Sequence, residues 1–134
     1  MIAYTRVATT AIAALIALGG VAQADILSGG PLYAGSPAEL NGFVNCRLFN
    51  AGIYGVTVTN RQIWDNTGVS EGLFADSCGP VVAPGKYCSY TAKIAGNFAF
   101  SCRAVTNGVD NNVSGVIEID NSASQPLFVI PLHN

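Results

Sequence analysis

Chemically reactive side chains are scarce in this sequence. It contains a single histidine, His133, and charged residues make up 10% of its 134 positions. General acid–base catalysis most often uses histidine, and metal centres draw on clustered His, Cys, Asp and Glu ligands. Because His133 lies next to the C-terminus and no catalytic or metal-ligating motif occurs elsewhere, the sequence predicts no enzyme activity, no metal site and no cofactor.

Positive charge is also sparse. Six Lys and Arg residues stand against eight Asp and Glu residues, which gives a formal net charge of −2. Nucleic acids and anionic membrane surfaces attract proteins through clustered positive charge. The composition therefore argues against both as partners.

The sequence has one long apolar run, from Val7 to Val21. Arg6 precedes it, and the small-residue pattern Ala22–Gln23–Ala24 follows it. A positive residue, an apolar stretch and a small-residue cleavage site are the parts of a secretory signal, so we expect residues 1–24 to be removed. The run is also shorter than the roughly 20 apolar residues of a membrane-spanning helix. These features predict a secreted or periplasmic protein with no membrane attachment after signal cleavage.

No segment after the signal shows helical periodicity. Short alternating runs of apolar and polar residues are instead separated by clusters of Gly, Pro, Asn and Asp, which is typical of a β-sandwich. We expect strands at 43–50, 54–59, 73–74, 87–94, 98–104, 113–120 and 127–132. The sequence thus predicts an all-β antiparallel sandwich of about seven strands over residues 42–134, preceded by a loosely held extension over residues 25–41.

All four cysteines, Cys46, Cys78, Cys88 and Cys102, follow the signal. They show no Cys-x-x-Cys spacing and have no nearby histidine, so structural disulfides are favoured over metal ligation or redox chemistry. Four cysteines allow three pairings. Alternation places Cys46 and Cys102 on the inward faces of two strands that are distant in sequence, which favours a bridge between packed sheets, as in immunoglobulin-like sandwiches. Cys78 would then pair with Cys88.

Several turn and core features occur in a characteristic order. The segment from Cys46 to Asn50 is followed by Gly52, then by Val56–Thr57–Val58, and later by Ala83–Pro84–Gly85 at the head of a strand. This layout resembles small immunoglobulin-like or fibronectin-like extracellular domains of bacteria, over about half of the mature chain. The resemblance implies a disulfide-stapled, immunoglobulin-like sandwich used for adhesion, spacing or assembly. The resemblance assigns no binding residue to this chain, because one fold serves many functions.

The single tryptophan, Trp64, has two interpretations. A lone tryptophan in a small sandwich usually fills the space between the sheets, because its ring buries a large apolar area. Alternatively, its polar neighbours and the aromatic residues Tyr33, Phe49 and Tyr54 could complete a sugar-stacking platform, so a glycan is a candidate ligand. The sequence favours the core position.

A partial calcium-loop pattern occurs near the end of the chain. Asp110, Asn112, Ser114 and Gly115 match its first half, with oxygen donors at alternate positions. The glutamate that completes such a loop is replaced by Asn121. We therefore expect a polar loop that leads into a strand.

The last segment, Leu127–Leu132, is apolar on both faces of its expected strand. Pro126 and Pro131 lack the N–H group that a central strand needs, and they therefore predict an edge strand. Such an edge can be covered by the extension after Asp25 or by a loop, or it can pair with another subunit by strand addition. The candidate interaction residues are Leu127, Phe128, Val129 and Ile130, together with Trp64.

These features predict an exported, non-catalytic structural or interaction module of the adhesion or assembly type. Its partner would be a protein, including a second copy that pairs through the C-terminal strand. The alternative function is that of a small secreted inhibitor, or of a domain that binds a glycan or protein through the disulfide-constrained loop Ser77–Lys86. A disulfide would pre-organise such a loop and reduce the entropy lost on binding.

Overall fold

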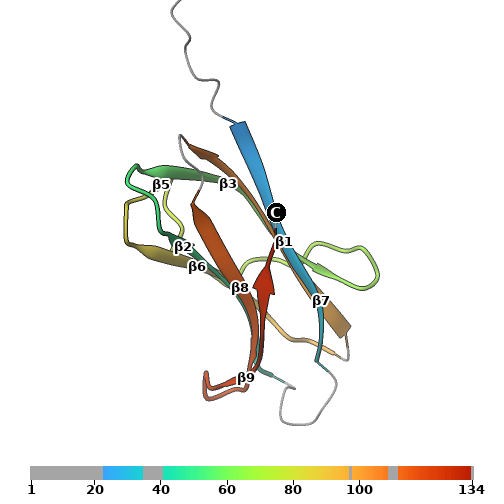
Figure 1. Ribbon diagram of the computed structural model, residues 1–134. Helices are drawn as coiled ribbons and strands as arrows, with labels where there is room; N and C mark the ends of the chain where they lie inside the picture. The colour runs from blue at the N-terminus through green and yellow to red at the C-terminus, as the bar shows by residue number, and fades with distance from the viewer. Residues whose placement is uncertain (1–22, 35–40, 97, 109–111, 134) are drawn as a thin grey trace, which may run out of the picture.

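The computed structural model describes residues 23–34, 41–96, 98–108 and 112–133, and every regular element among them is a β-strand. The strands are β1 (Gln23–Ala34), β2 (Phe43–Asn50), β3 (Val56–Asp65), β4 (Ala75–Asp76), β5 (Val81–Val82), β6 (Tyr87–Lys93), β7 (Phe98–Gly108), β8 (Val113–Asp120) and β9 (Pro126–Leu132). They form two antiparallel sheets that face each other (Figure 1). The predicted all-β sandwich is confirmed, with nine strands in the described residues. Residues 1–22, nearly all of the predicted signal peptide, lie outside the described residues.

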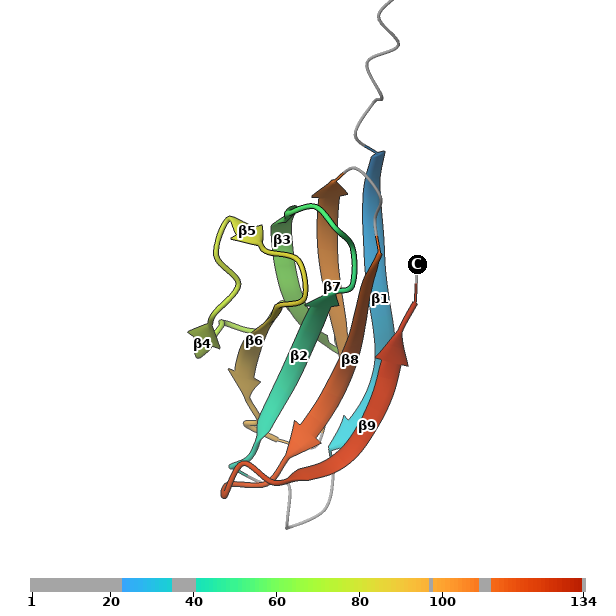
Figure 2. The same cartoon turned by 60° about the vertical axis from the view of Figure 1, so that its left-hand side comes forward.

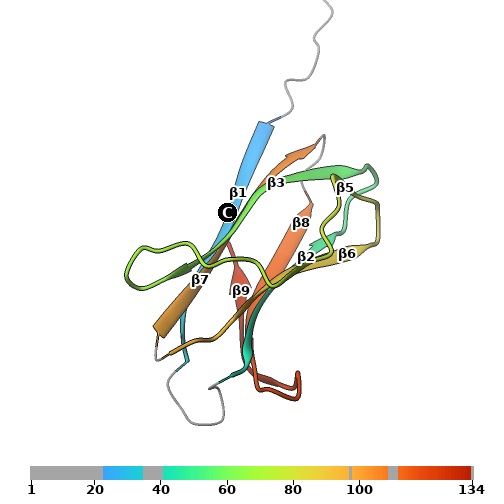
Figure 3. The ribbon, with the colours of Figure 1, turned by 180° about the vertical axis from the view of Figure 1, so that it is seen from behind.

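The two sheets differ in size and strand order. One has the order β1-β7-β3-β5 and is called the β7 sheet, and the other has the order β4-β6-β2-β8-β9 and is called the β2 sheet. Figure 2 shows β2, β8 and β9 side by side, with the β7 sheet behind them, and Figure 3 shows the molecule from the opposite side. The edge strands β1 and β9 approach each other, and an isolated bridge joins Ser28 to His133.

The core lies between the sheets and is built from alternate residues of the facing strands. Its buried side chains include Val44, Cys46 and Leu48 from β2, and Phe100, Cys102 and Ala104 from β7. Tyr90 of β6 crosses the core, and its hydroxyl donates a hydrogen bond to the carbonyl of Arg103 in the opposite sheet at 3.0 Å. Burial raises the pKa of this phenol, so Tyr90 remains a neutral donor that ties the sheets together.

The expectation of a loosely held extension over residues 25–41 was wrong for its first part. Residues 23–34 form β1, which pairs with β7 and buries Leu27 and Ala34. The expectation was wrong because the sequence Gly29–Gly30–Pro31 is typical of a loop by composition. In the structure it forms an irregularity within β1. A Cβ atom at Gly29 would lie 2.9 Å from the backbone oxygen of Pro131 and 3.1 Å from Cα of Leu132, so only glycine allows β1 this close to β9. Residues 35–40 lie outside the described residues.

Strand β3 begins later than its alternation predicts. The strand was expected to begin at residue 54, but the side chain of Tyr54 is 53% exposed and β3 begins at Val56. The buried side chain of Asn50 causes the delay. Its Nδ2 donates to the carbonyls of Tyr54 and Val82 at 2.8 and 2.9 Å, and its Oδ1 accepts from the N–H of Gly52 at 2.9 Å. These bonds hold the chain after Asn50 in a bend.

Both predicted disulfides are present. Cys46 of β2 is bonded to Cys102 of β7 across the sandwich, with 5.9 Å between their Cα atoms. Cys78, which follows β4, is bonded to Cys88 of β6, with a Cα separation of 4.8 Å. The first bridge therefore joins the two sheets through the core, and the second fastens the chain after β4 onto β6.

Candidate functional site

The last strand, β9, lies at the free end of the β2 sheet and pairs within that sheet only with β8, so its predicted edge position is confirmed. Three of its predicted interaction residues are exposed. Leu127 is 37% exposed, Phe128 48% and Val129 52%, and Ile130 packs against the core. The interpretation that a loop caps this strand is therefore wrong for these three side chains. We call Leu127–Val129 the exposed β9 segment.

Apolar side chains lie on both faces of β9, as its sequence predicts. Phe128 lies opposite Ile119 of β8, a core residue, and Val129 lies opposite Glu118. Because paired residues of antiparallel strands share a face, Phe128 points toward the interior side of the sheet and Val129 toward the outer side. The strand thus exposes apolar surface on both sides of its backbone.

The backbone of β9 is covered at its C-terminal end and open before it. The N–H of His133 donates to the carbonyl of Ser28 at 2.7 Å, and the N–H of Ser28 donates back to His133 at 2.8 Å, on the side away from β8. Backbone groups alternate in direction along a strand, so Pro131 and Val129 also direct theirs away from β8. Val129 offers an N–H and a carbonyl at the edge, whereas Pro131 has no N–H and its carbonyl lies against Gly29 of β1. The extension after Asp25, one of the expected covers, therefore covers the edge of β9 from Pro131 to His133.

A groove of about 460 Å³ lies on the outer face of the β2 sheet and ends at β9. Its lining includes Arg47 and Phe49 of β2, Tyr87 of β6, Val116 of β8 and Pro131 of β9. Phe49 is 42% exposed and Tyr87 73%. The described residues that line the groove are mainly apolar and aromatic, so it has the surface to receive apolar or aromatic groups.

A polar network crosses the same outer face beside this groove. The hydroxyl of Thr91 donates to Oδ1 of Asn45, and Nδ2 of Asn45 donates to Oδ2 of the buried Asp120. Next to them, Nε of Arg47 lies 2.8 Å from Oε2 of Glu118. Burial raises the pKa of Glu118, the charge of Arg47 opposes that rise, and the charge of Asp120 adds to it.

The raised pKa of Glu118 predicts a pH-dependent loss of stability. Because the pKa is higher in the folded state than in the unfolded state, ionising Glu118 costs folding free energy. Its contribution is present below the ordinary glutamate pKa of 4.5 and is lost as the pH rises through the folded-state value. We expect the unfolding free energy of the protein, minus that of E118Q, to fall as the pH rises above 4.5. Urea unfolding at several pH values measures this difference, and a constant or rising value would contradict the assignment.

The interpretation of Trp64 as a core residue was wrong. Trp64 is half-buried on the outer face of the β7 sheet, and Ile63, which is fully buried opposite Cys102, takes the core position. A register shift between Thr59 and Gln62 causes this exchange, because one extra residue in a strand reverses which side chains point inward.

The four aromatic residues of the glycan hypothesis do not come together. Trp64 is paired with Ser101 of β7, and Tyr33 is paired with Ala99 on the other side of the same strand, so these two rings share one outer face. Phe49 belongs to the outer face of the other sheet. Tyr54 lies in the bend before β3. Of the four aromatic residues, only Trp64 and Tyr33 could therefore contact the same sugar.

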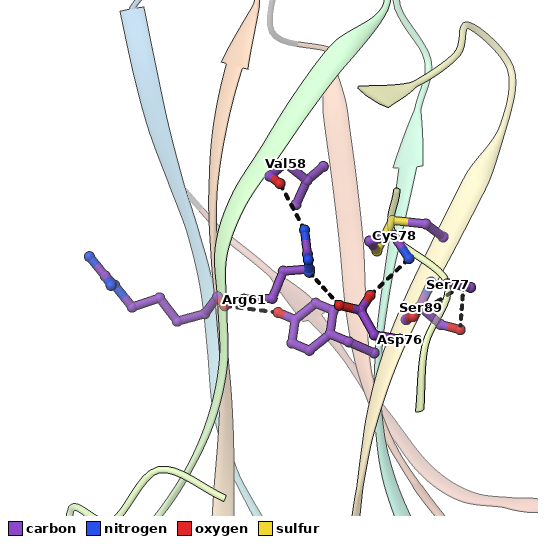
Figure 4. The surroundings of a disulfide bond; sticks show 9 residues. Val58, Arg61, Asp76, Ser77, Cys78 and Ser89 are labelled. Atoms are coloured by element: carbon purple, nitrogen blue, oxygen red, sulfur yellow. Dashed lines mark hydrogen bonds and ion pairs between the residues drawn. A yellow bond between two sulfur atoms is a disulfide. The ribbon is translucent and has the colours of Figure 1, made fainter. Parts of the chain in front are cut away.

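The disulfide-constrained loop is anchored to the body of the sandwich (Figure 4). Oδ2 of Asp76 accepts from Nε of Arg61 at 2.8 Å, and Oδ1 accepts from the N–H of Cys78 at 2.9 Å. Further along, β5 pairs with β3, and the side chain of Val82 is buried. The loop therefore crosses from one sheet to the other and is held by both.

Comparison of the chain with protein-family models, with curated proteins and with solved structures finds no match. Within the described ranges, no helix is long and apolar enough to cross a membrane. The same residues contain no group of three or more His, Cys, Asp or Glu side chains placed to hold a metal ion. Of the partial calcium pattern, Asp110 lies outside the described residues, and Ser114 and Gly115 belong to β8.

Proposed function

We propose that this protein is an exported, non-catalytic interaction module that self-associates through the edge of β9. The observation that carries this proposal is the exposed β9 segment, in which the N–H and the carbonyl of Val129 have no partner strand among the described residues. Edge strands of this kind are usually shortened, charged or covered, because they pair readily with another chain. Here the residues of β9 carry no charge at all.

Export to the periplasm or the extracellular space is part of the proposal. Two disulfides are typical of proteins from oxidising compartments, and thiols are kept reduced in the cytosol of most cells. The signal-like sequence of residues 1–24 supports the same route.

A relation to immunoglobulin-like domains is proposed for the central strands. In those domains the second and sixth strands are joined by a disulfide between the sheets. Cys46 of β2 and Cys102 of β7 are joined in this way, and the neighbouring strands β2-β6-β4 and β3-β7 have the corresponding order. The outer strands differ. Here β1 lies beside β7 and β8 lies beside β2, whereas the first and last strands of an immunoglobulin domain have the opposite neighbours.

The alternative function, binding through the loop Ser77–Lys86, receives less support. That loop is fastened to both sheets by β5 and by the bonds around Asp76, so little of it projects from the body. Of the four aromatic residues, only Trp64 and Tyr33 on the β7 sheet support a glycan ligand.

Substitution of Val129 by lysine tests the proposed self-association. Val129→Lys places a charge of the same sign in each copy within the exposed β9 segment, so we expect the dissociation constant of the oligomer to rise roughly tenfold or more. Sedimentation velocity over a range of protein concentrations measures this constant. The matched control is Val81→Lys, because Val81 is 57% exposed and lies on the edge strand of the other sheet. Self-association is refuted if the parent protein and both variants sediment as monomers at every concentration.

A further inference from the structure

We propose that the outer face of the β7 sheet carries a saccharide-binding site. Its centre is a cleft of about 510 Å³ along β1, which we call the β1 cleft. The lining includes Ser28 and Gly30 of β1, Ser101 of β7 and His133, which follows β9. This site goes beyond the self-association proposed above, and neither depends on the other.

The β1 cleft lies where two consecutive residues of β1, Gly29 and Gly30, have no side chain. The pairing of β1 with β7 shifts after Gly29. Gly30 has a φ of 120°, and a Cβ atom there would lie 2.6 Å from the carbonyl oxygen of Phe100 and 2.7 Å from Oγ of Ser101. Only glycine fits so close to β7, and the surface of β1 therefore stays open beside Ser101.

The polar side chains of the cleft lie on the outer side of the sheet. Ser28 follows the buried Leu27 and lies opposite His133, and Ser101 alternates with buried residues of β7. Alternate residues of a strand point to opposite faces, and paired residues share a face, so the two hydroxyls and the imidazole are on the outer side. A hydroxyl both donates and accepts hydrogen bonds, and a neutral imidazole does so through its two nitrogens.

Two aromatic side chains flank this polar surface. Trp64 of β3 lies directly opposite Ser101 and is half-buried. Tyr33 of β1 is 61% exposed and lies opposite Ala99, which is two residues from Ser101 on the same face of β7. The C–H face of a pyranose ring is apolar, and its hydroxyls lie around the rim. An indole or phenol ring can therefore cover the C–H face while the hydroxyls reach the cleft.

The charge of the site favours a neutral glycan. Among the described residues that line the cleft, only His133 can ionise. Arg103 lies opposite Ser28 on β7, and its Nη1 donates to Oε1 of Gln62 at 3.0 Å. An anionic polymer requires several clustered cations, and a purely apolar ligand would leave the hydroxyls without partners. An uncharged ligand rich in hydroxyls avoids both penalties.

Titration with neutral hexasaccharides tests the site, and the single tryptophan reports on it. The probes are cellohexaose, maltohexaose and chitohexaose, and binding is followed by tryptophan fluorescence and by calorimetry. We expect at least one probe to bind and to change the emission of Trp64. Tyr33→Ala removes a stacking surface and should raise the dissociation constant roughly tenfold. Ser101→Val removes a hydroxyl from the cleft and should also weaken binding.

Tyr54→Ala is the matched control, because Tyr54 is 53% exposed and lies in the bend before β3, away from the cleft. It should leave the dissociation constant unchanged, and circular dichroism verifies that each variant is folded. If no probe binds at millimolar concentration, the site is refuted. Binding that tolerates both Tyr33→Ala and Ser101→Val, or that leaves the tryptophan emission unchanged, would overturn its location. Self-association is measured by sedimentation and would stand in either case.

Discussion

Replacing Cys46 and Cys102 together by alanine is expected to lower the free energy of unfolding by about 4 kcal/mol. The bridge joins residues separated by 56 positions, so its loss restores a large amount of chain entropy to the unfolded state. Both cysteines are buried, at 0% and 1% exposure, in the centre of the contact between the sheets. A loss of this size is a large fraction of the stability of a small domain, so a substantial population of unfolded protein should appear well below the normal denaturation midpoint.

The matched control is the double alanine variant of Cys78 and Cys88. These residues are separated by 10 positions, and their bridge closes a shorter loop, so the expected loss is about 3 kcal/mol. Guanidinium unfolding of the oxidised proteins, followed by tryptophan fluorescence, measures both losses. A greater loss for the Cys78–Cys88 variant would show that the bridge between the sheets is not the main covalent support of the fold.

The strands and disulfides that follow from simple alternation could be predicted from the sequence. Strands β2 and β8 have the expected bounds, and inward alternation of β2 and β7 identified the pairing of Cys46 with Cys102. The short strand expected at 73–74 lies two residues later, as β4. Strand β5 consists of only two residues, too few to show any period.

The failures have identifiable physical causes. Strand β1 was taken for a loose extension because glycine and proline usually indicate loops, whereas Gly29 is needed where β1 passes Leu132. That contact joins residues that are far apart in the sequence, so no local pattern could reveal it. Trp64 was assigned to the core because a lone tryptophan usually fills the space between sheets, whereas the register shift after Thr59 turns its side chain to the outer face.

The position of the candidate site was predictable from local sequence, whereas its backbone directions and the neighbouring groove depend on long-range contacts. Pro126 and Pro131 placed β9 at an edge, and its uninterrupted apolar sequence marked the residues that are exposed. The direction of its backbone groups could not be predicted, because it depends on the long-range bond between Ser28 and His133. The groove was also missed. Phe49 and Tyr87 each occupy a strand position that faces outward, but only the pairing of β2 with β6 brings them side by side.

Replacing Asn50 by alanine is expected to cost about 3 kcal/mol of unfolding free energy. The side chain is 1% exposed and makes three hydrogen bonds, to the carbonyls of Tyr54 and Val82 and from the N–H of Gly52. Alanine removes all three bonds, of which those with Val82 and Gly52 are buried and the one with Tyr54 is partly buried. Each unpaired buried group costs roughly 1 kcal/mol or more, so the loss exceeds that of an ordinary surface substitution.

Asn121 provides the matched control because it has the same side chain and also makes three hydrogen bonds, all of them exposed. Its Oδ1 accepts from the N–H groups of Ala123 and Gln125, and its Nδ2 donates to the side chain of Gln125. Water can replace these bonds, so Asn121→Ala should cost less than about 1 kcal/mol. Urea unfolding of the two variants compares the losses directly. If they were equal, burial would not explain the importance of Asn50, and the bend before β3 would have to be maintained by other contacts.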